Sequence, residues 1–314
     1  MNKLQVYTKI NTLYKRFMNL KGNVPNDKWL VFQNQIILGD FSDDYIKYIK
    51  DLEFDCFSKI DGTNTKIAYF PSTGEICIGG KTDNADIEHT GQRAFLEPVC
   101  ERIKPVLAEM FPKESARFVP VMNDKNQIKY YNLPYGNDKI MYEDIHPEDF
   151  ANGDQKVVVL EEVPIYIYGE FCGKKIQAAG GNYDKEGNRF YVFDICQQGW
   201  YVPIDMLVEY CDKLGLEIAP YLGQMTIPEA EAMVKEGFKT KVPNASNPDF
   251  IEEGIVARPV ILIKDPRGKR IIVKIKHSDY NKIKSAIDTV GEGEYLKFLT
   301  WYKENKDKLE NGNF

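Results

Sequence analysis

Strand-like segments occur in adjacent pairs separated by short turns, and this pattern constrains the fold of the chain more than any other feature. In residues 54–78, β-branched and aromatic side chains surround two turns, IDGTN and PSTGE, and the segments 254–263 and 270–277 flank the turn KDPRGK. Three more strands are predicted at 156–163, 164–171 and 189–195. Helices and strands are mixed without a regular βαβ alternation, so we expect an α+β fold with mostly antiparallel sheets flanked by helices.

Apolar residues at helical spacing predict two helices near the N-terminus. The first stripe consists of Ile10, Leu13, Tyr14 and Phe17. The second, shorter stripe consists of Tyr45, Ile46 and Ile49. Between them, the run WLVFQNQIIL at 29–38 reads as an extended segment.

Four further helices are predicted from periodicity and capping signals. Residues 93–111 place five apolar side chains on one face, namely Phe95, Val99, Ile103, Val106 and Met110. Pro98 and Pro105 in this segment predict a kink or a late start. One helix is expected between Pro203 and Gly215, another after Thr226 as N-cap, and an amphipathic one from Ser278 onward.

Charge is distributed unevenly along the chain, whose formal net charge is -6. Residues 1–50 carry 8 basic and 4 acidic side chains, residues 51–250 carry 20 and 33, and residues 251–314 carry 13 and 10. Net charge alone would argue against a protein that binds nucleic acid, whereas its placement gives basic ends on either side of an acidic middle.

The predicted domain organisation follows the motifs rather than the charge. We expect residues 1–50 to be an N-terminal segment that packs on a core domain formed by 51–280. Residues 112–156 are polar and rich in Asn, Asp and Pro, so within that domain they read as an insertion or a long excursion. Residues 281–314 are expected to form a short helical appendage.

Several classes of protein are excluded by simple counts. The six cysteines contain no CxxC pair and the three histidines are scattered, so the sequence predicts neither a zinc site nor a disulfide framework. No run approaches the roughly 18 apolar residues of a membrane span, and the N-terminus lacks an apolar signal-peptide core. We therefore expect a cytoplasmic protein that does not enter a membrane.

Lysines at strand positions are the first candidates for chemistry. Lys59 follows a strand and stands two residues before Asp61 and Gly62, where glycine allows a tight turn against a ligand. In RIIVKIKH, alternation places Lys274 and Lys276 on one face of the strand together with Ile272, and Ile271, Val273 and Ile275 on the other. A lysine nucleophile must lose its proton, and neighbouring cations favour that loss.

Motifs that follow one another along the chain carry a resemblance to a known family. They are SKIDGTNTKI, IGGKTDNADI, YGEFCGKKIQ, FYVFDI, EEGIVARP and RIIVKIKH. In this order they resemble the covalent nucleotidyltransferase superfamily of ATP-dependent ligases and capping enzymes, and most closely the RNA ligases that seal nicks. The resemblance covers about residues 54–280 and implies the nucleotidyltransferase fold, built around a nucleotide cleft.

The resemblance implies catalytic roles for four residues. Lys59 matches the lysine that attacks the α-phosphate of ATP and becomes adenylylated. Lys274 and Lys276 match the pair that contacts this phosphate and helps drive adenylylation. Glu253 matches the carboxylate associated with the catalytic metal, Mg²⁺ or Mn²⁺.

Nucleotide-binding roles are implied in the same way. Asp61, Gly62 and Asn64 belong to the motif of the nucleophile. Glu170 matches the residue that contacts the ribose hydroxyls, and Phe193 matches the aromatic that stacks on adenine.

Two positions depart from the family pattern. Lys81 stands where many members have arginine, which keeps the charge but loses the bidentate fork. Ser58 stands where nick-sealing RNA ligases often have a glutamate that reads adenine.

The expected partner is RNA, as a nicked duplex or an RNA/DNA hybrid, bound by a monomer. Gln177, Arg258, Lys264 and Arg267 are the predicted substrate-binding residues, the last three from a basic segment that can track a phosphate backbone. Only 38 residues follow Lys276, fewer than the additional barrel of DNA ligases and capping enzymes needs, which favours an RNA ligase. The alternatives are an ATP-dependent DNA ligase or mRNA guanylyltransferase, and a catalytically inactive relative that binds nucleic acid.

Overall fold

The structure is a computed structural model that describes residues 7–18, 24–82, 85–88, 90–133, 139–141, 155–197 and 200–310. Its contacts divide the chain into two compact units. Unit 1 comprises residues 1–6, 64–169 and 192–217, and unit 2 comprises 7–63, 170–191 and 218–314. Each unit is built from segments that are distant in sequence.

Unit 2 contains a five-stranded sheet with the order β1-β17-β16-β4-β15. Its strands are β1 (Asn11–Thr12), β4 (Phe54–Ser58), β15 (Tyr221–Met225), β16 (Gly254–Pro259) and β17 (Val273–Lys276). β4 lies between β16 and β15, and all five of its residues are buried, including the polar Asp55 and Ser58. β16 is antiparallel to both β4 and β17, whereas β1 is parallel to β17.

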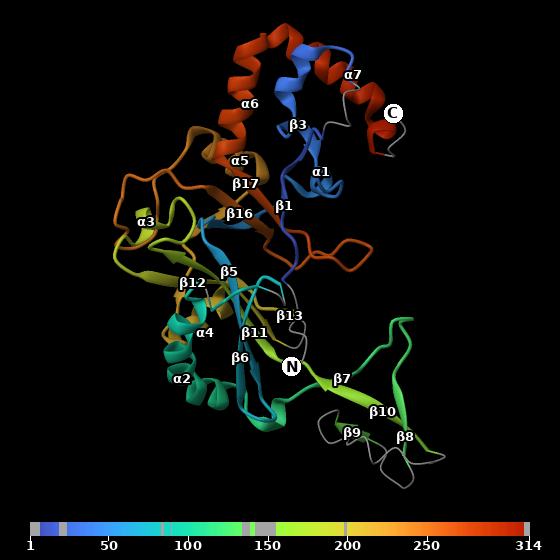
Figure 1. The fold of residues 1–314 in the computed structure, drawn as a ribbon, viewed down its shortest axis with the longest axis vertical. Coiled ribbons are helices and arrows are strands. Elements are labelled where there is room, and N and C mark those ends of the chain that lie inside the picture. The colour runs from blue at the N-terminus through green and yellow to red at the C-terminus, as the bar shows by residue number, and fades with distance from the viewer. Residues whose placement is uncertain are drawn as a thin grey trace. The chain divides into compact units, whose positions relative to one another are not determined.

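The N-terminal segment and the C-terminal helices pack together in unit 2 (Figure 1). The elements are β2 (Tyr14–Arg16), the 3₁₀-helix η1 (Asp27–Phe32), β3 (Ile36–Phe41), α1 (Ile46–Ile49), α6 (His277–Val290) and α7 (Glu292–Glu310). Aromatic rings form the contact, and Phe298 stacks on Phe32 with 4.6 Å between ring centroids. Both rings are fully buried, so Phe298→Ala would cost about 3–5 kcal/mol of unfolding free energy.

Two short helices complete unit 2. α5 (Ile227–Glu236) begins at Thr226, whose hydroxyl accepts a hydrogen bond from the Glu229 N–H, and the Glu229 side chain accepts one from the Thr226 N–H. This capping box confirms the predicted N-cap. α3 (Gly180–Tyr183) is a single turn that buries Tyr183.

A six-stranded sheet lies mostly in unit 1, with the order β13-β12-β11-β5-β6 and β14 paired to β12. The strands are β5 (Thr63–Phe70), β6 (Glu75–Gly80), β11 (Ile165–Gly173), β12 (Asn188–Gln197), β13 (Trp200–Tyr201) and β14 (Glu217–Ile218). The boundaries between the units fall within β5, β11, β12 and β14.

Two helices of unit 1, α2 (Gln92–Met110) and α4 (Ile204–Leu214), lie next to each other (Figure 1). Arg102 of α2 donates to the carbonyl oxygens of Leu214 and Gly215 at 2.9 and 3.1 Å, where a cation stabilises the negative end of α4. Gly215 has a φ of 61°, which a glycine adopts at low cost, so α4 ends where the sequence predicts.

The polar segment at 112–156 contributes to a small sheet of unit 1. It contains η2 (Lys113–Ser115), β7 (Phe118–Pro120), β8 (Tyr130–Leu133), β9 (Lys139–Met141) and the start of β10 (Gln155–Glu162). β7 and β8 are antiparallel to β10 and β9 is parallel to it. Part of the predicted insertion, 134–138 and 142–154, lies outside the described residues.

The structure bears out the predicted α+β class with mostly antiparallel sheets, and it corrects four local predictions. Residues 10–17 form β1 and β2 rather than a helix, because Leu13 and Phe17 are buried by partners from the distant C-terminal part of the chain. The segment 29–38 is half 3₁₀-helix and half strand rather than extended throughout. The predicted apolar face of α2 is wrong except for Ile103. The residues that α2 buries are Gln92, Leu96, Cys100, Ile103 and Leu107.

α2 also starts at Gln92 and contains both prolines, so the late start was the wrong alternative. Among the described residues, no helix is both long enough and apolar enough to span a bilayer.

Candidate active site

The ends of three neighbouring strands bring Lys59, Glu253 and Lys276 together. In the antiparallel register, Ser58 of β4 is opposite Ile255, and Lys276 of β17 is opposite Gly254. The Lys59 N–H donates to the Gly254 carbonyl at 2.8 Å, and the His277 N–H donates to the Glu253 carbonyl at 2.9 Å. Backbone hydrogen bonds therefore fix Lys59 after β4, Glu253 before β16 and Lys276 at the end of β17 as neighbours.

Glu253 forms ion pairs with both lysines. One carboxylate oxygen contacts the Lys59 Nζ and the other contacts the Lys276 Nζ. The side chain of Lys59 is 19% exposed, that of Glu253 16% and that of Lys276 27%, so a ligand can reach all three. Two cations around one carboxylate leave a net positive charge, which favours a phosphate group.

Gly254 is required by the close approach of β16 and β17. Its φ is 153°, and a Cβ atom at this position would lie 1.9 Å from the Ile275 carbonyl oxygen. A side chain here would push the two strands apart and with them Glu253 and Lys276. The glycine of EEGIVARP therefore maintains the geometry of the ion pairs.

Glu252 points into the interior, opposite to its neighbour Glu253. It is 1% exposed and accepts hydrogen bonds from the Thr240 hydroxyl at 2.6 Å and from the Tyr183 hydroxyl at 3.1 Å. Burial raises the pKa of Glu252 above its ordinary value, although these hydrogen bonds act in the other direction. Glu252 is thus a structural carboxyl, whereas Glu253 contacts the two lysines.

Tyr183 connects this buried carboxyl to the loop that follows Lys59. Its oxygen accepts a hydrogen bond from the Asp61 N–H at 3.1 Å. Burial and the neighbouring Glu252 raise the pKa of Tyr183. Its hydroxyl therefore stays protonated and donates a hydrogen bond to the Glu252 carboxyl group. The loop between β4 and β5 is held on one side by this contact.

Gly62 is held on the other side by β11. A Cβ atom on Gly62 would lie 2.4 Å from the Phe171 carbonyl oxygen and 2.9 Å from the Glu170 Cγ. The absence of a side chain at 62 thus lets the loop rest directly on the strand that carries the half-buried Glu170. Gln177 lies further along in an exposed turn with a φ of 53°.

Lys274 is on the same face of β17 as Lys276, as the alternation predicts. Both lysines are half-buried, whereas Val273 and Ile275 are each 1% exposed on the opposite face. Lys274 is paired with Thr12 of β1, so the N-terminal segment covers this edge of the sheet.

Three predicted nucleotide-binding residues, Asn64, Lys81 and Phe193, belong to unit 1. The buried Oδ1 of Asn64 has no hydrogen-bond partner within the described part of the chain. Lys81 follows β6 and is exposed, and Phe193 of β12 is half-buried.

Tyr191, the other aromatic of this strand face, is fully buried and accepts a hydrogen bond from Arg189 at 3.1 Å.

The three basic residues predicted to bind substrate differ in exposure. Arg258 is 4% exposed, and its guanidinium lies 4.7 Å from the Phe57 ring centroid. Its burial favours a structural role, because a cation over an aromatic ring inside the sheet packing is already engaged. Lys264 and Arg267 are exposed, and the Arg267 side chain is 88% exposed beside Asp265.

A resident metal site of the usual kind is not preformed in the part of the chain that the structure describes. No three His, Cys, Asp or Glu side chains come together there. The carboxylate of Glu253 fits the way in which Mg²⁺ is bound, through one or two carboxylates together with substrate phosphates.

Sequence reasoning missed two residues of the site. Tyr183 and Thr240 lie in segments that read as loops, NYDKEGN and KTKVPNASNPDF, and nothing in either pattern indicates contact with Glu252. The one available signal was the pair Glu252-Glu253, since adjacent strand residues point to opposite faces.

The chain belongs to the RNA ligase family, because a family model described as RNA ligase matches residues 53–276. A comparison with curated proteins finds no match. Among solved structures, the chain is similar to a mutant of the Naegleria gruberi RNA ligase with ATP and Mn, at 14% identity over 77% of this chain and 54% of that one, with a TM-score of 0.42.

Two further structures of the Naegleria gruberi RNA ligase are also similar to the chain. The structure of that ligase with PPi is 16% identical to this chain, over 75% of this chain and 52% of that one, with a TM-score of 0.42. Another mutant with ATP and Mn has 14% identity, 88% and 63% coverage and a TM-score of 0.42. The chain therefore spans less than two thirds of the length of these structures.

Proposed function

We propose that this protein is an ATP-dependent RNA ligase that joins 3′-hydroxyl and 5′-phosphate ends through a lysyl-AMP intermediate, in RNA repair or sealing. The observation that carries the proposal is the pair of contacts from Glu253 to Lys59 and Lys276, in a chain of the RNA ligase family. A partly exposed lysine beside a second lysine is the arrangement that nucleophilic attack on a phosphate requires.

The reaction has three steps, and each exchanges one bond to phosphorus for another. Deprotonated Lys59 attacks the α-phosphorus of ATP, so an N–P bond forms and the bond to pyrophosphate breaks. The 5′-phosphate of the RNA then takes the AMP from Lys59. Finally the 3′-hydroxyl attacks the adenylylated 5′ end, the phosphodiester forms and AMP leaves.

The positive groups of unit 2 neutralise the developing negative charge. Lys276 stands beside the nucleophile, and Lys274 follows on the same strand face. Phosphoryl transfer depends chiefly on positioning and charge neutralisation, which these strand residues supply without rearrangement.

Glu253 is the residue that would hold a divalent cation, Mg²⁺ or Mn²⁺. When bound, such an ion supplies further positive charge to the phosphate oxygens. The Naegleria gruberi RNA ligase has been solved with ATP and Mn, which supports this assignment for a chain of the same family.

The other residues that the motifs single out bind the nucleotide in this proposal. Glu170 contacts the ribose hydroxyls, Phe193 stacks on adenine, and Lys81 binds a phosphate. Asp61, Gly62 and Asn64 shape the turn after the nucleophile. Lys264, Arg267 and Gln177 are exposed and serve the RNA strand.

Labelling with ATP tests the proposal directly. The full chain is incubated with α-labelled ATP and Mg²⁺ or Mn²⁺, and the adduct is mapped by mass spectrometry. We expect one AMP on Lys59 and none on Lys59→Ala, while Lys50→Ala, an exposed lysine of the same unit, labels like wild type. Absence of AMP on Lys59 of the wild type would refute the proposal.

A chase decides between the remaining alternatives. The labelled protein is supplied with nicked RNA, RNA/DNA hybrid and DNA duplexes, and labelling with GTP is run in parallel. RNA or hybrid sealing supports the RNA ligase, DNA sealing alone supports a DNA ligase, and labelling by GTP supports a guanylyltransferase.

We propose in addition that the protein acts as a monomer in the cytoplasm. All six cysteines lie in the described part of the chain, and none of them forms a disulfide, which suits a reducing compartment.

A further inference from the structure

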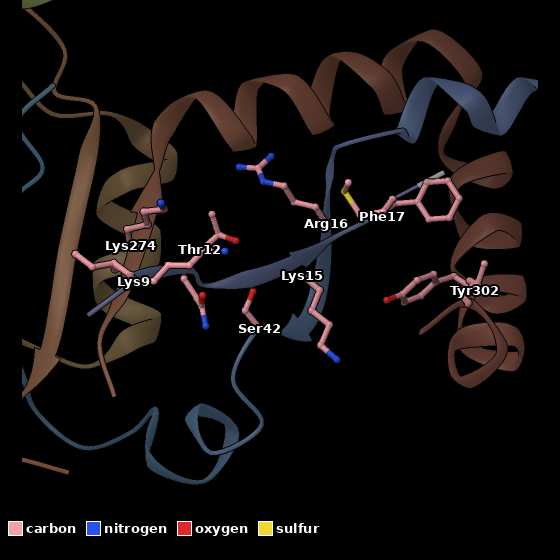
Figure 2. Close-up of a pocket in the computed structure, with 12 residues that line it drawn as sticks. Lys9, Thr12, Lys15, Arg16, Phe17, Ser42, Lys274 and Tyr302 are labelled. Carbon is pink, nitrogen blue, oxygen red and sulfur yellow. The ribbon is translucent and has the colours of Figure 1, made fainter. Parts of the chain in front are cut away.

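A cavity of about 580 Å³ lies in unit 2 between the N-terminal strands, β17 and α7. Figure 2 shows its wall, which includes Lys9 and Thr12 before and within β1, Lys15 within β2, and Lys274 on β17. Some of the residues that line the cavity are exposed to solvent, and one of them, Met18, is 62% exposed. The cavity is therefore open to a ligand from solvent.

Positive charge dominates this cavity. Of the described residues that line it, four are cationic (Lys9, Lys15, Arg16 and Lys274) and none carries a carboxylate. Arg16 is neutralised by Asp279 of α6, to which its Nη2 donates at 2.6 and 2.7 Å. Figure 2 shows Arg16 and Lys15 leaving the strand in opposite directions.

Hydroxyl groups accompany the cations. Thr12 and Ser42 line the same cavity and are half-buried, and the Thr12 hydroxyl donates to the Tyr14 carbonyl oxygen at 2.8 Å, which leaves Ser42 as the hydroxyl donor for a ligand. Tyr302 also lines it, but its hydroxyl donates to Asp40 at 2.8 Å. Lysines together with hydroxyls form the donor set that recurs around the phosphates of nucleic acids.

Strand β17 links the cavity to the candidate active site, because it carries a residue of each. Lys274 lines the cavity, and Lys276, two residues further on the same strand face, contacts Glu253. Residues two apart in a strand are about 7 Å apart, so the cavity begins about one nucleotide from Lys276.

Most of the cavity wall lies outside the part of the chain that matches the family. The match covers 53–276, whereas the N-terminal lysines, Ser42 and α7 lie before or after it. In the proposed function the shared part reacts with ATP, so groups added around its edge are expected to serve the nucleic acid that the protein joins.

We propose that this cavity binds phosphate groups of the RNA strand through Lys9 and Lys15, next to the Lys274 that the proposed function places at the phosphate of ATP. The assignment rests on the proposed function, because it takes RNA to be the substrate at the adjacent Lys59 site. Contacts to phosphate position a strand without reading its sequence, so binding here is independent of base sequence.

The test compares Lys9→Ala/Lys15→Ala with wild type and with Lys50→Ala, a lysine of the same unit that does not line the cavity. Binding of a labelled nicked RNA duplex is measured by fluorescence anisotropy at several salt concentrations, without ATP. Formation of lysyl-AMP from ATP alone is measured separately. Lys9 is exposed and Lys15 half-buried, and Lys15→Gln provides a milder second variant.

We expect the double variant to bind RNA about tenfold more weakly, with the salt slope reduced by about 0.7 to 0.9 for each lost contact. Lysyl-AMP formation should remain within twofold of wild type, and Lys50→Ala should match wild type in both assays. Unchanged RNA affinity and salt slope would overturn the proposal. So would slower lysyl-AMP formation with unchanged RNA binding, because the cavity would then hold the polyphosphate of ATP.

The two proposals fail in different ways. If wild type forms no lysyl-AMP, the proposed function fails, and the anisotropy titration still decides whether the cavity binds RNA. If lysyl-AMP forms and the variants bind RNA normally, only the cavity assignment fails.

Discussion

Tyr183 donates its hydroxyl hydrogen to Glu252 at 3.1 Å in an interior where neither side chain is more than 1% exposed. The same tyrosine oxygen accepts the N–H of Asp61. One buried hydroxyl thus connects the loop after Lys59, the proposed nucleophile, with the segment that ends in Glu253. These contacts add to the backbone hydrogen bond between Lys59 and Gly254 that already places Lys59 next to Glu253.

Tyr183→Phe should therefore slow lysyl-AMP formation as well as destabilise the protein. The variant leaves a buried carboxyl and a backbone N–H each without one partner, which costs about 1–3 kcal/mol for each group. Urea unfolding measures the loss of stability, and single-turnover labelling with ATP measures the rate. We expect the rate to fall at temperatures where the variant remains folded.

Tyr210→Phe is the matched control for this variant. Its hydroxyl makes a longer contact of 3.4 Å with Gln197 in unit 1. It should label like wild type. If Tyr183→Phe labels at the wild-type rate while folded, Tyr183 has no positioning role.

Glu252→Gln should become more stable relative to wild type as pH rises. Burial raises the pKa of Glu252 in the folded protein, so the folded state holds the proton more tightly than the unfolded chain. The wild type therefore loses stability from the unfolded pKa, about 4.3, up to the raised folded value, and glutamine does not titrate. Urea unfolding of both proteins at several pH values checks the trend.

Glu229→Gln provides a control of opposite sign. Hydrogen bonds from Thr226 lower the pKa of Glu229, so its contribution to stability is present at neutral pH and is lost as pH falls through the folded value. Relative to wild type, this variant should become less stable as pH rises. A stability difference for Glu252→Gln that does not change with pH would contradict the burial argument.

The strand pairs were predictable because their signals are local. Alternation in 270–277 correctly separates the half-buried Lys274 and Lys276 from Val273 and Ile275, and Thr226 correctly marks the start of α5. These signals need only a few adjacent residues and the period of the element.

The N-terminal helix prediction failed for a reason that no local pattern contains. The spacing of Ile10, Leu13, Tyr14 and Phe17 suits one face of a helix, yet Thr12 pairs with Lys274 and Phe17 packs against Phe298. Partners more than 250 residues away in the chain determine the conformation here.

The site was predictable to the extent that motifs carry it. The motifs correctly brought Lys59, Glu253 and Lys276 to one place, and the roles of these residues stay predictions. The charge of a residue does not tell whether its side chain is buried. Arg258 was therefore predicted to bind the RNA, whereas its side chain is buried and packs over the Phe57 ring. Tyr183 escaped notice because its contacts come from three separate segments.

Lys276→Ala should slow lysyl-AMP formation about 100-fold, because the variant loses a cation beside the attacked phosphate. The loss of stability should be at most about 1 kcal/mol, since the ion pair with Glu253 is partly exposed. Lys282→Ala, an exposed lysine of α6, should change neither quantity. A Lys276→Ala protein whose lower rate is fully accounted for by unfolding would instead indicate a structural role.

Gly62→Ala should disrupt the loop after Lys59. The new methyl group would lie 2.4 Å from the Phe171 carbonyl oxygen and 2.9 Å from the Glu170 Cγ, so the loop must move away from β11. We expect lysyl-AMP formation to fall at least tenfold and stability to fall by about 1–3 kcal/mol, as for overpacking. Gly293→Ala is the matched control, because a methyl group there meets nothing within 4 Å and α7 gains about 0.4–1 kcal/mol. Wild-type labelling by Gly62→Ala would show that the contact between the loop and β11 is not needed for nucleophilic attack.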